Sequence, residues 1–158
     1  MRKSKINISG FKIGTAENRE GLTGVTVILA PDGGATAGVD VRGCAPGTRE
    51  TDLLDPRKTV QKIHAVVLSG GSAFGLEAAS GCVKYLAEQG VGFPIGNVCV
   101  PIVCSAVLFD LMIGDEKAYP DLLMGYEAAK SASSEFLSGC NGAGTGATAV
   151  SYTHLRAH

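Results

Sequence analysis

Residues 65–90 read AVVLSGGSAFGLEAASGCVKYLAEQG and carry the clearest structural signal of the sequence. Residues 65–68 are all apolar, which is typical of a short buried strand. Residues 70–72 hold two glycines and a serine, and glycine adopts the backbone angles of tight turns without penalty. Over residues 73–89 apolar side chains recur at helical spacing, and Gly90 stands where a helix-ending glycine is expected. The segment therefore predicts a buried strand that enters a helix through a glycine turn.

The glycine turn is also a candidate binding site. A strand that turns directly into a helix presents backbone N–H groups at the positive helix end, which suits an anion or a developing oxyanion. Gly70, Gly71 and Ser72 are therefore candidate site residues, although the tightness of the turn alone explains the same glycines. The nucleophile-elbow pattern Gly-x-Ser-x-Gly fails here, because Phe74 stands where the second glycine is required.

The segments on both sides of this unit predict a mixed fold. Apolar alternation and β-branched runs indicate strands. We expect a hairpin in which residues 37–41 pair back on 25–29, and further strands at residues 6–13 and at 98–109, the latter interrupted by Pro101. A second helix is expected over residues 120–137, because the proline at its start suits a first helical position. Strands followed by alternating helices and strands indicate an α+β or layered α/β fold.

Length, charge and hydropathy exclude several classes of protein. The chain has 158 residues, enough for one domain with a buried core. Fifteen acidic and fourteen basic residues give a formal net charge of -1, so no overall positive field attracts a nucleic-acid backbone. The apolar stretches are shorter than the roughly 20 residues of a membrane span, and no signal-peptide core follows the basic start. We therefore expect a cytoplasmic protein without a nucleic-acid or membrane partner.

The cysteines and histidines do not form a recognisable metal site. The five cysteines contain no Cys-x-x-Cys pair, and two of the three histidines lie in the last five residues. We therefore expect no metal and no cofactor, and we interpret the cysteines as buried free thiols of a reducing compartment. His64, directly before the strand at 65–68, is interpreted as a strand-edge residue rather than a catalytic base.

Two further segments are rich in glycine. Residues 42–54, RGCAPGTRETDLL, fit either an ordered functional loop or a plain solvated one. Residues 142–147, GAGTGA, formally match the dinucleotide fingerprint Gly-x-Gly-x-x-Ala. A helical segment is expected before them where that fingerprint needs a strand, so a dinucleotide site is not predicted.

The order of the sequence motifs along the chain resembles one known family. The motifs are TGVTV at 23–27, RGCAPGTRETDLL at 42–54, HAVVLSGGSAFGL at 64–76, VPIV at 100–103, FDL at 109–111, GY at 125–126 and GAGTGAT at 142–148. They resemble the DmpA-type self-processing aminopeptidases, which are serine peptidases of the N-terminal-nucleophile kind, related in fold to ornithine acetyltransferase. The resemblance covers residues 9–149 and is most specific at 42–54 and 64–76.

The resemblance implies a layered αββα sandwich and a precursor that cuts itself once. The cut exposes a serine or threonine whose own α-amino group, with a pKa of about 7.7–8.0, serves as the general base. In the family this nucleophile lies beyond the second glycine loop, so we expect the present chain to contain no catalytic residue. The C-terminal (β-chain) portion would be its partner. The intact protein would form homo-oligomers and hydrolyse small peptides or amides.

The resemblance also implies which residues border the substrate or oxyanion region. These are Gly70, Gly71, Ser72, Phe109, Cys140 and Asn141. Family members often carry an asparagine at the position of Cys140, whereas this chain has its asparagine one residue later. In the aminopeptidase branch an acid and a tyrosine bind the substrate amine in the segment at 107–109, which is apolar here. An ammonium group would find no counter-charge there, so the substrate preference is expected to differ.

The chain is therefore divided into two parts. Residues 1–149 are expected to form the N-terminal, α-chain-like part of a peptidase domain, an incomplete α+β sandwich that is inactive by itself. Residues 150–158 depart from the family pattern and are interpreted as a non-native tail from a frameshift or sequencing adapter, so Ser151 is not assigned as the nucleophile. Two alternatives stay open: an acyltransferase of the ornithine acetyltransferase type, and a non-enzymatic module that binds a small molecule.

Overall fold

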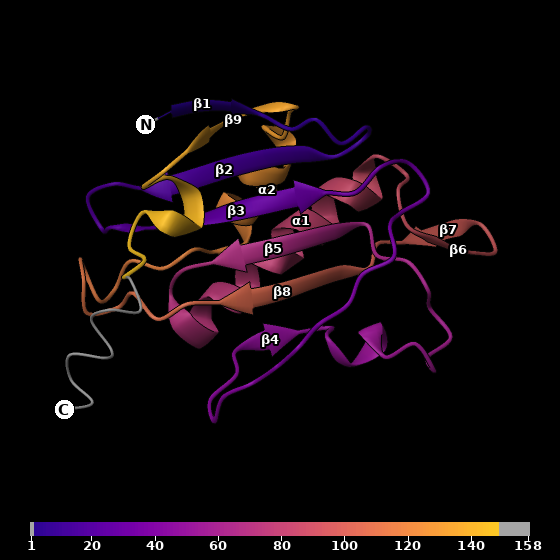
Figure 1. The fold of residues 1–158 in the computed structure, drawn as a ribbon, viewed down its shortest axis with the longest axis horizontal. Coiled ribbons are helices and arrows are strands. Elements are labelled where there is room, and N and C mark those ends of the chain that lie inside the picture. Colours follow the sequence, from indigo (N-terminus) through magenta and orange to yellow (C-terminus); the bar gives the residue numbers. More distant parts are fainter. Residues whose placement is uncertain (1, 149–158) are drawn as a thin grey trace.

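The centre of the molecule is a five-stranded mixed sheet with the order β2-β3-β5-β8-β4 (Figure 1). The computed structural model describes residues 2–148, so the predicted tail at 150–158 lies outside the described residues. The strands are β2 (Lys12–Asn18), β3 (Thr23–Leu29), β4 (Thr48–Arg49), β5 (Ala65–Ser69) and β8 (Val103–Val107). The pair β5–β8 is parallel, and its neighbours pair antiparallel.

Two helices pack on one face of this sheet and lie behind it in Figure 1. They are α1 (Ala78–Glu88) and α2 (Leu122–Lys130). A Cβ atom on Gly81 or on Gly125 would collide with the backbone of the other helix, so glycine allows the two helices to approach closely. The buried core between helices and sheet contains Val25, Val27, Leu29, Ala65, Val67, Ala78, Ala79, Cys82, Leu86, Val103, Ala128 and Ala129.

Smaller elements surround the sheet. β1 (Arg2–Lys5) pairs antiparallel with β9 (Glu135–Ser138). β6 (Phe93–Ile95) and β7 (Val98–Val100) form a hairpin that projects from the main body in Figure 1. The short 3-10 helices are η1 (Asp52–Leu54), η2 (Ser72–Glu77) and η3 (Gly142–Gly144), and η3 lies in front of β2 and β3 in Figure 1. Neither helix of the described part has the length and apolar character needed to cross a bilayer.

The sheet face opposite the helices is only partly covered by residues 2–148. Thr26 and Ile28 pair in register with Leu68 and Val66, and all four alternate with core residues, so they point to this second face. Leu68 is 39% exposed there. The expected α+β class is confirmed. The described residues form one helical layer on one main sheet, which is the arrangement of an incomplete αββα sandwich.

The helix expected over residues 120–137 is wrong in its C-terminal part. α2 begins after Asp121, whose side chain accepts a hydrogen bond from the Met124 N–H at 2.8 Å, and it ends at Lys130. Residues 135–138 instead form β9, because a partner strand, β1, is available from the opposite end of the described chain. Local periodicity does not report a pairing between segments so far apart in sequence.

Other predicted boundaries also change. The expected hairpin return at 37–41 does not form; Ala35 instead makes an isolated bridge to Ile63. The predicted strand at 98–109 is divided at Pro101 into β7 and β8, since proline supplies no N–H for strand pairing. The helix predicted over 73–89 is α-helical from Ala78, because its first turns form the 3-10 helix η2. The expected strand at 6–13 reduces to the start of β2 at Lys12.

Candidate functional site

A pocket of about 380 Å³ opens on the second face of the sheet, between the ends of β5 and β8 and the loop that contains η3. The parallel strands β5 and β8 end at the same edge, which is where open sheets commonly place ligand sites. Residues from four separated segments meet at this pocket because the sheet order brings them together. They are Thr26, Leu68, Ser69, Ala106, Val107, Leu108, Gly139, Asn141, Ala143 and Gly144.

The predicted glycine turn follows the pocket residue Ser69. Gly71 has φ 77° and Ser72 has φ 52°, so the backbone is left-handed at two consecutive residues. A serine rarely adopts this conformation, and surrounding contacts must hold it. The three N–H groups of the turn all donate to protein acceptors: Gly70 to the Gly24 carbonyl, Gly71 to the Asp110 carboxylate and Ser72 to the Leu108 carbonyl. These three donors are thus engaged within the protein rather than directed at an anion.

Asp110 is the buried acid that organises this end of the sheet. Its side chain accepts hydrogen bonds from the Thr23 hydroxyl at 2.8 Å and from the Gly71 N–H at 2.6 Å, and the residue is only 3% exposed. A Cβ atom on Gly70 or on Gly146 would collide with the Asp110 side chain. Asp110 therefore connects its own loop to the start of β3 and to the glycine turn, which are far apart in sequence.

Asn141 is buried in a second polar cluster on the other side of η3. Its amide nitrogen is placed toward Glu17, at 2.9 Å, because carboxylate oxygens only accept hydrogen bonds, and its amide oxygen then accepts from the Thr15 hydroxyl at 2.8 Å. Glu17 also accepts from the Gly142 N–H at 3.3 Å and pairs with Arg19. The cluster fixes the start of the glycine loop against β2.

The structure brings only one of the six predicted site residues into the pocket wall. Asn141 lines the pocket, while Gly70, Gly71 and Ser72 follow the lining residue Ser69 in sequence but do not line the pocket themselves. Phe109 is 58% exposed beside the lining residue Leu108, and Cys140 is exposed between two lining residues. Their roles in substrate or oxyanion binding stay predictions.

Sequence reasoning missed most of the pocket wall. Leu68 and Ala106 are apolar strand residues, which carry no local functional signal. Leu108 and Ala143 lie in the two segments, 107–109 and 142–147, that the family resemblance or the glycine pattern had marked, but neither residue was predicted individually. Asp110 was visible only as part of the motif at 109–111, and Glu17 had no signal at all, since their partners come from distant segments.

The buried titratable groups inside the fold are suited to structure rather than to nucleophilic chemistry. His64 is 6% exposed, its Nδ1 accepts from the Ile102 N–H at 3.1 Å, and burial lowers its pKa. Burial raises the pKa of Cys82 to about 12, and burial together with the Glu50 charge raises that of Cys104 to about 11. Both thiols are therefore protonated and weakly nucleophilic near neutral pH.

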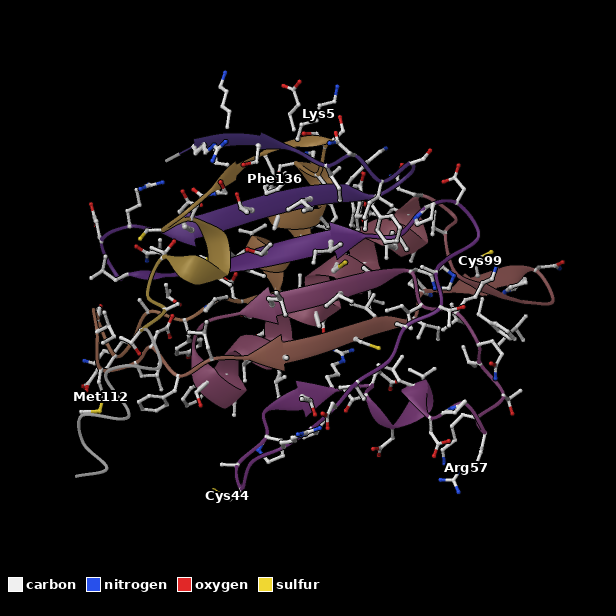
Figure 2. The ribbon with its side chains drawn as sticks, in the orientation of Figure 1. Lys5, Cys44, Arg57, Cys99, Met112 and Phe136 are labelled. Carbon is white, nitrogen blue, oxygen red and sulfur yellow. The ribbon has the colours of Figure 1, made fainter. Side chains whose placement is uncertain are left out.

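The remaining cysteines correct the expectation that all five are buried. Cys44 and Cys140 are exposed, and Cys99 is half-buried. Figure 2 places Cys44 and Cys99 in separate outer segments, away from the edge with Met112 where β5 and β8 end. Within residues 2–148, no group of three or more His, Cys, Asp or Glu side chains is arranged to hold a metal ion.

Comparisons with known proteins connect this chain to hydrolytic enzymes. Residues 5–153 match the model of peptidase family S58. The chain is 48% identical over 126 residues to an uncharacterised aminopeptidase of Mycobacterium tuberculosis, covering 80% of this chain and 36% of the relative. It is 36% identical over 146 residues to the 6-aminohexanoate-oligomer endohydrolase of Paenarthrobacter ureafaciens, covering 92% of this chain and 38% of the relative. The chain thus spans less than half the length of these curated relatives.

Solved structures support the fold. The PH0078 protein of Pyrococcus horikoshii superimposes with a TM-score of 0.71 at 22% identity, over 89% of this chain and 44% of that one. A Burkholderia beta-aminopeptidase gives a TM-score of 0.65 at 19% identity, over 88% and 41% of the two chains. Ornithine acetyltransferase of Mycobacterium tuberculosis gives 0.50 at 15% identity, over 92% and 78%. At these identities the likeness concerns the fold alone.

Proposed function

Because this chain belongs to peptidase family S58, the family of DmpA-type enzymes, we propose that it forms the N-terminal part of an amidohydrolase that cleaves peptide or small amide bonds. The observation that carries the proposal is the pocket beside η3. It lies at the ends of parallel strands, within the segment that matches the family, and two buried polar clusters fix the loops around it. A fixed, concave wall is what an enzyme needs to orient an amide for attack.

We further propose that the nucleophile is a serine or threonine exposed by self-cleavage outside residues 2–148. Inside this range Ser69 donates its hydroxyl to the Gly70 carbonyl, and His64 uses Nδ1 as an acceptor, so neither forms a nucleophile–base pair. The new α-amine would take the hydroxyl proton as the oxygen attacks the amide carbon. The same proton would pass to the leaving amine, and water would then release the acyl group as an acid.

Three further features of the whole protein are proposals. The second face of the sheet, with Leu68 39% exposed, supports packing of a C-terminal portion against it, and this portion would then complete the wall of the pocket beside η3. Phe74 and Tyr119 stack on the surface with ring centroids 4.7 Å apart and remain 58% and 39% exposed, which supports a homo-oligomer. The five free cysteines support a reducing, cytoplasmic location.

Mass spectrometry and kinetics of the full-length protein test the proposal. We expect two fragments after expression, and hydrolysis of an amide such as a p-nitroanilide. A product that stays in one piece and binds the substrate without turnover would point to a non-enzymatic binder. Faster transfer of the acyl group to ornithine than to water would point to an acyltransferase.

The 158-residue chain offers a second test. A serine-directed fluorophosphonate probe should leave it unmodified, because the proposed nucleophile is not among its residues. A stoichiometric adduct on the 158-residue chain would contradict the proposed position of the nucleophile.

A further inference from the structure

The hairpin of β6 and β7 has an exposed apolar face. In register, Phe93 pairs with Val100, and Ile95 pairs with Val98. Because residues two apart on a strand point to the same side, these four side chains share one face, which we call the hairpin face. All four are exposed, Val98 at 62% and Ile95 at 58%. The hairpin therefore presents a continuous apolar surface to its surroundings.

The sequence around the hairpin carries no charge. Residues 89–109 contain no Asp, Glu, Lys, Arg or His, although charged residues stand directly on both sides of this range, Glu88 and Asp110. An antiparallel hairpin that meets water on one face normally carries polar side chains there. A projecting hairpin with an apolar, uncharged face is instead typical of a contact with another protein surface.

The hairpin is shaped to make this contact through its face rather than through its edge. Its two-residue turn begins with Gly96, whose φ of 58° is the left-handed angle that such a turn needs at this position. The turn thus fixes the hairpin before any partner binds. Pro94, in the middle of β6, supplies no N–H to a further strand, so strand addition along this edge is disfavoured.

We propose that the hairpin face stacks on the hairpin face of a second copy of this chain, about a two-fold axis. In a two-fold contact the same patch meets itself, so any charge on the patch would face a like charge. The uncharged hairpin face avoids this repulsion, whereas a partner recognised by opposite charge would find none to pair with. The inference goes beyond the proposed hydrolysis and assigns a surface to the proposed homo-oligomer.

The hairpin is separate from the sheet face that the C-terminal portion is proposed to cover. β6 and β7 form a sheet of their own, and β7 precedes the start of β8, whereas the pocket beside η3 lies where β5 and β8 end. Figure 1 shows the hairpin projecting at the end of the molecule opposite to that pocket. A second copy can therefore reach the hairpin face while the C-terminal portion packs on the main sheet.

Photo-crosslinking of the full-length protein identifies what covers the hairpin face. Ile95→p-benzoylphenylalanine should give a covalent dimer in which two copies of the tryptic peptide 85–117, which contains the whole hairpin, are joined. A crosslink into the C-terminal portion, a crosslink to any other segment of a second copy, or no crosslink would overturn the inference.

A charge on the hairpin face gives an independent test by sedimentation velocity. Val98→Lys should raise the apparent Kd of the assembly at least tenfold, because it places an ammonium group from each copy in an apolar contact. Leu123→Lys is the matched control, since Leu123 is also 62% exposed but lies on α2, and should leave the Kd unchanged. An unchanged Kd in a folded Val98→Lys variant would overturn the inference. If that variant does not fold, the crosslink decides alone.

The same measurements separate the inference from the proposals on which it borders. Dissociation by Phe74→Lys but not by Val98→Lys would keep the homo-oligomer and place its contact at the stack of Phe74 on Tyr119, which overturns the inference. A wild-type protein that is monomeric at all concentrations would overturn the homo-oligomer and the inference together. Cleavage of a p-nitroanilide by the same samples tests the proposed hydrolysis separately.

Discussion

Asp110 is the residue whose environment differs most from that of an ordinary surface acid. It is almost fully buried, and its carboxylate accepts two hydrogen bonds, from Thr23 and from Gly71. Both donors are distant from Asp110 in sequence. Buried carboxylates in proteins need such partners, because an unpaired one carries a large desolvation cost. The pocket wall therefore depends on a group that does not itself line the pocket.

Replacing Asp110 with alanine should destabilise the protein by about 2–3 kcal/mol, since the buried Thr23 hydroxyl and Gly71 N–H would lose their acceptor. Urea unfolding in dilute solution measures the change. Asp115→Ala is the control, because Asp115 is exposed and its side chain accepts a hydrogen bond from the nearby Lys117 N–H. If the free energy of unfolding fell equally in the two variants, the buried hydrogen bonds of Asp110 would not contribute to stability as expected.

His64 gives the protein a pH dependence of stability. Its pKa is lowered by burial in the folded state, and the Ile102 N–H donates to an unprotonated Nδ1. The unfolded chain, with a histidine pKa of about 6.5, therefore binds the proton more readily. Stability should be fully present above pH 6.5 and fall as the pH drops below it.

Urea unfolding at pH 7.5, 6.5 and 5.5 checks this direction. The variant His64→Asn keeps an acceptor but cannot titrate, so its stability should change less over the same interval. A wild-type stability that rises on acidification, or an identical pH profile in the variant, would contradict the role given to His64.

At the scale of elements, the contact between α1 and α2 shows how glycine residues determine helix packing. The glycine content of the chain, 22 residues, is unusual, and at Gly81 and Gly125 it serves close helix packing. An exposed helical glycine is normally improved by alanine, by about 0.5–1 kcal/mol. Here a methyl group on either glycine would meet the backbone of the neighbouring helix, so the sign of the effect reverses.

Gly81→Ala and Gly125→Ala should each lower the free energy of unfolding by about 1–3 kcal/mol, the usual range for overpacking. Thermal denaturation followed by circular dichroism measures the loss. Gly38→Ala is the matched control, because a Cβ at Gly38 meets open space and should leave the melting temperature nearly unchanged. If all three variants melt alike, the helix contact is more adaptable than its geometry indicates.

The same elements show what sequence could predict. The strand, turn and helix of residues 65–90 are signalled by neighbours within the segment, so β5, the glycine turn and α1 were predicted nearly in place. The residues of β9 were predicted as helix because the spacing of their apolar side chains continues the pattern of α2. The strand that makes them β structure, β1, is distant in sequence and leaves no signal in that spacing. Asn141 was predicted from the family resemblance, one residue after the position where family members carry their asparagine. The strand residues of the pocket wall and Glu17 gain their role only through contacts with segments distant in sequence.

At the scale of the whole molecule, the sheet is protected unequally. Helices bury one face, while Leu68 on the other face remains 39% exposed beside the half-buried Ile28 and Val66. A contiguous apolar surface of this kind binds hydrophobic dyes.

The 158-residue chain should therefore increase the fluorescence of 8-anilinonaphthalene-1-sulfonate several-fold while its circular dichroism stays that of a folded protein. Leu68→Ser should reduce the signal, and Leu123→Ser, on the helix side, should not. If the folded chain did not increase the dye fluorescence, the second face of the sheet would be covered, contrary to the prediction.

The parallel pairing of β5 with β8 also sets an order of events during biosynthesis. Antiparallel β3 and β5 can meet once residue 69 has left the ribosome, but β8 joins β5 only after residue 107 has emerged. α1 is made in between and connects the two strands, as parallel neighbours require. At synthesis rates of about 5–20 residues per second, the nascent chain spends roughly two to eight seconds with the outer side of β5 unpaired. During this interval the open edge of β5 can pair with a strand of another chain, so it is the stage most exposed to edge-to-edge aggregation.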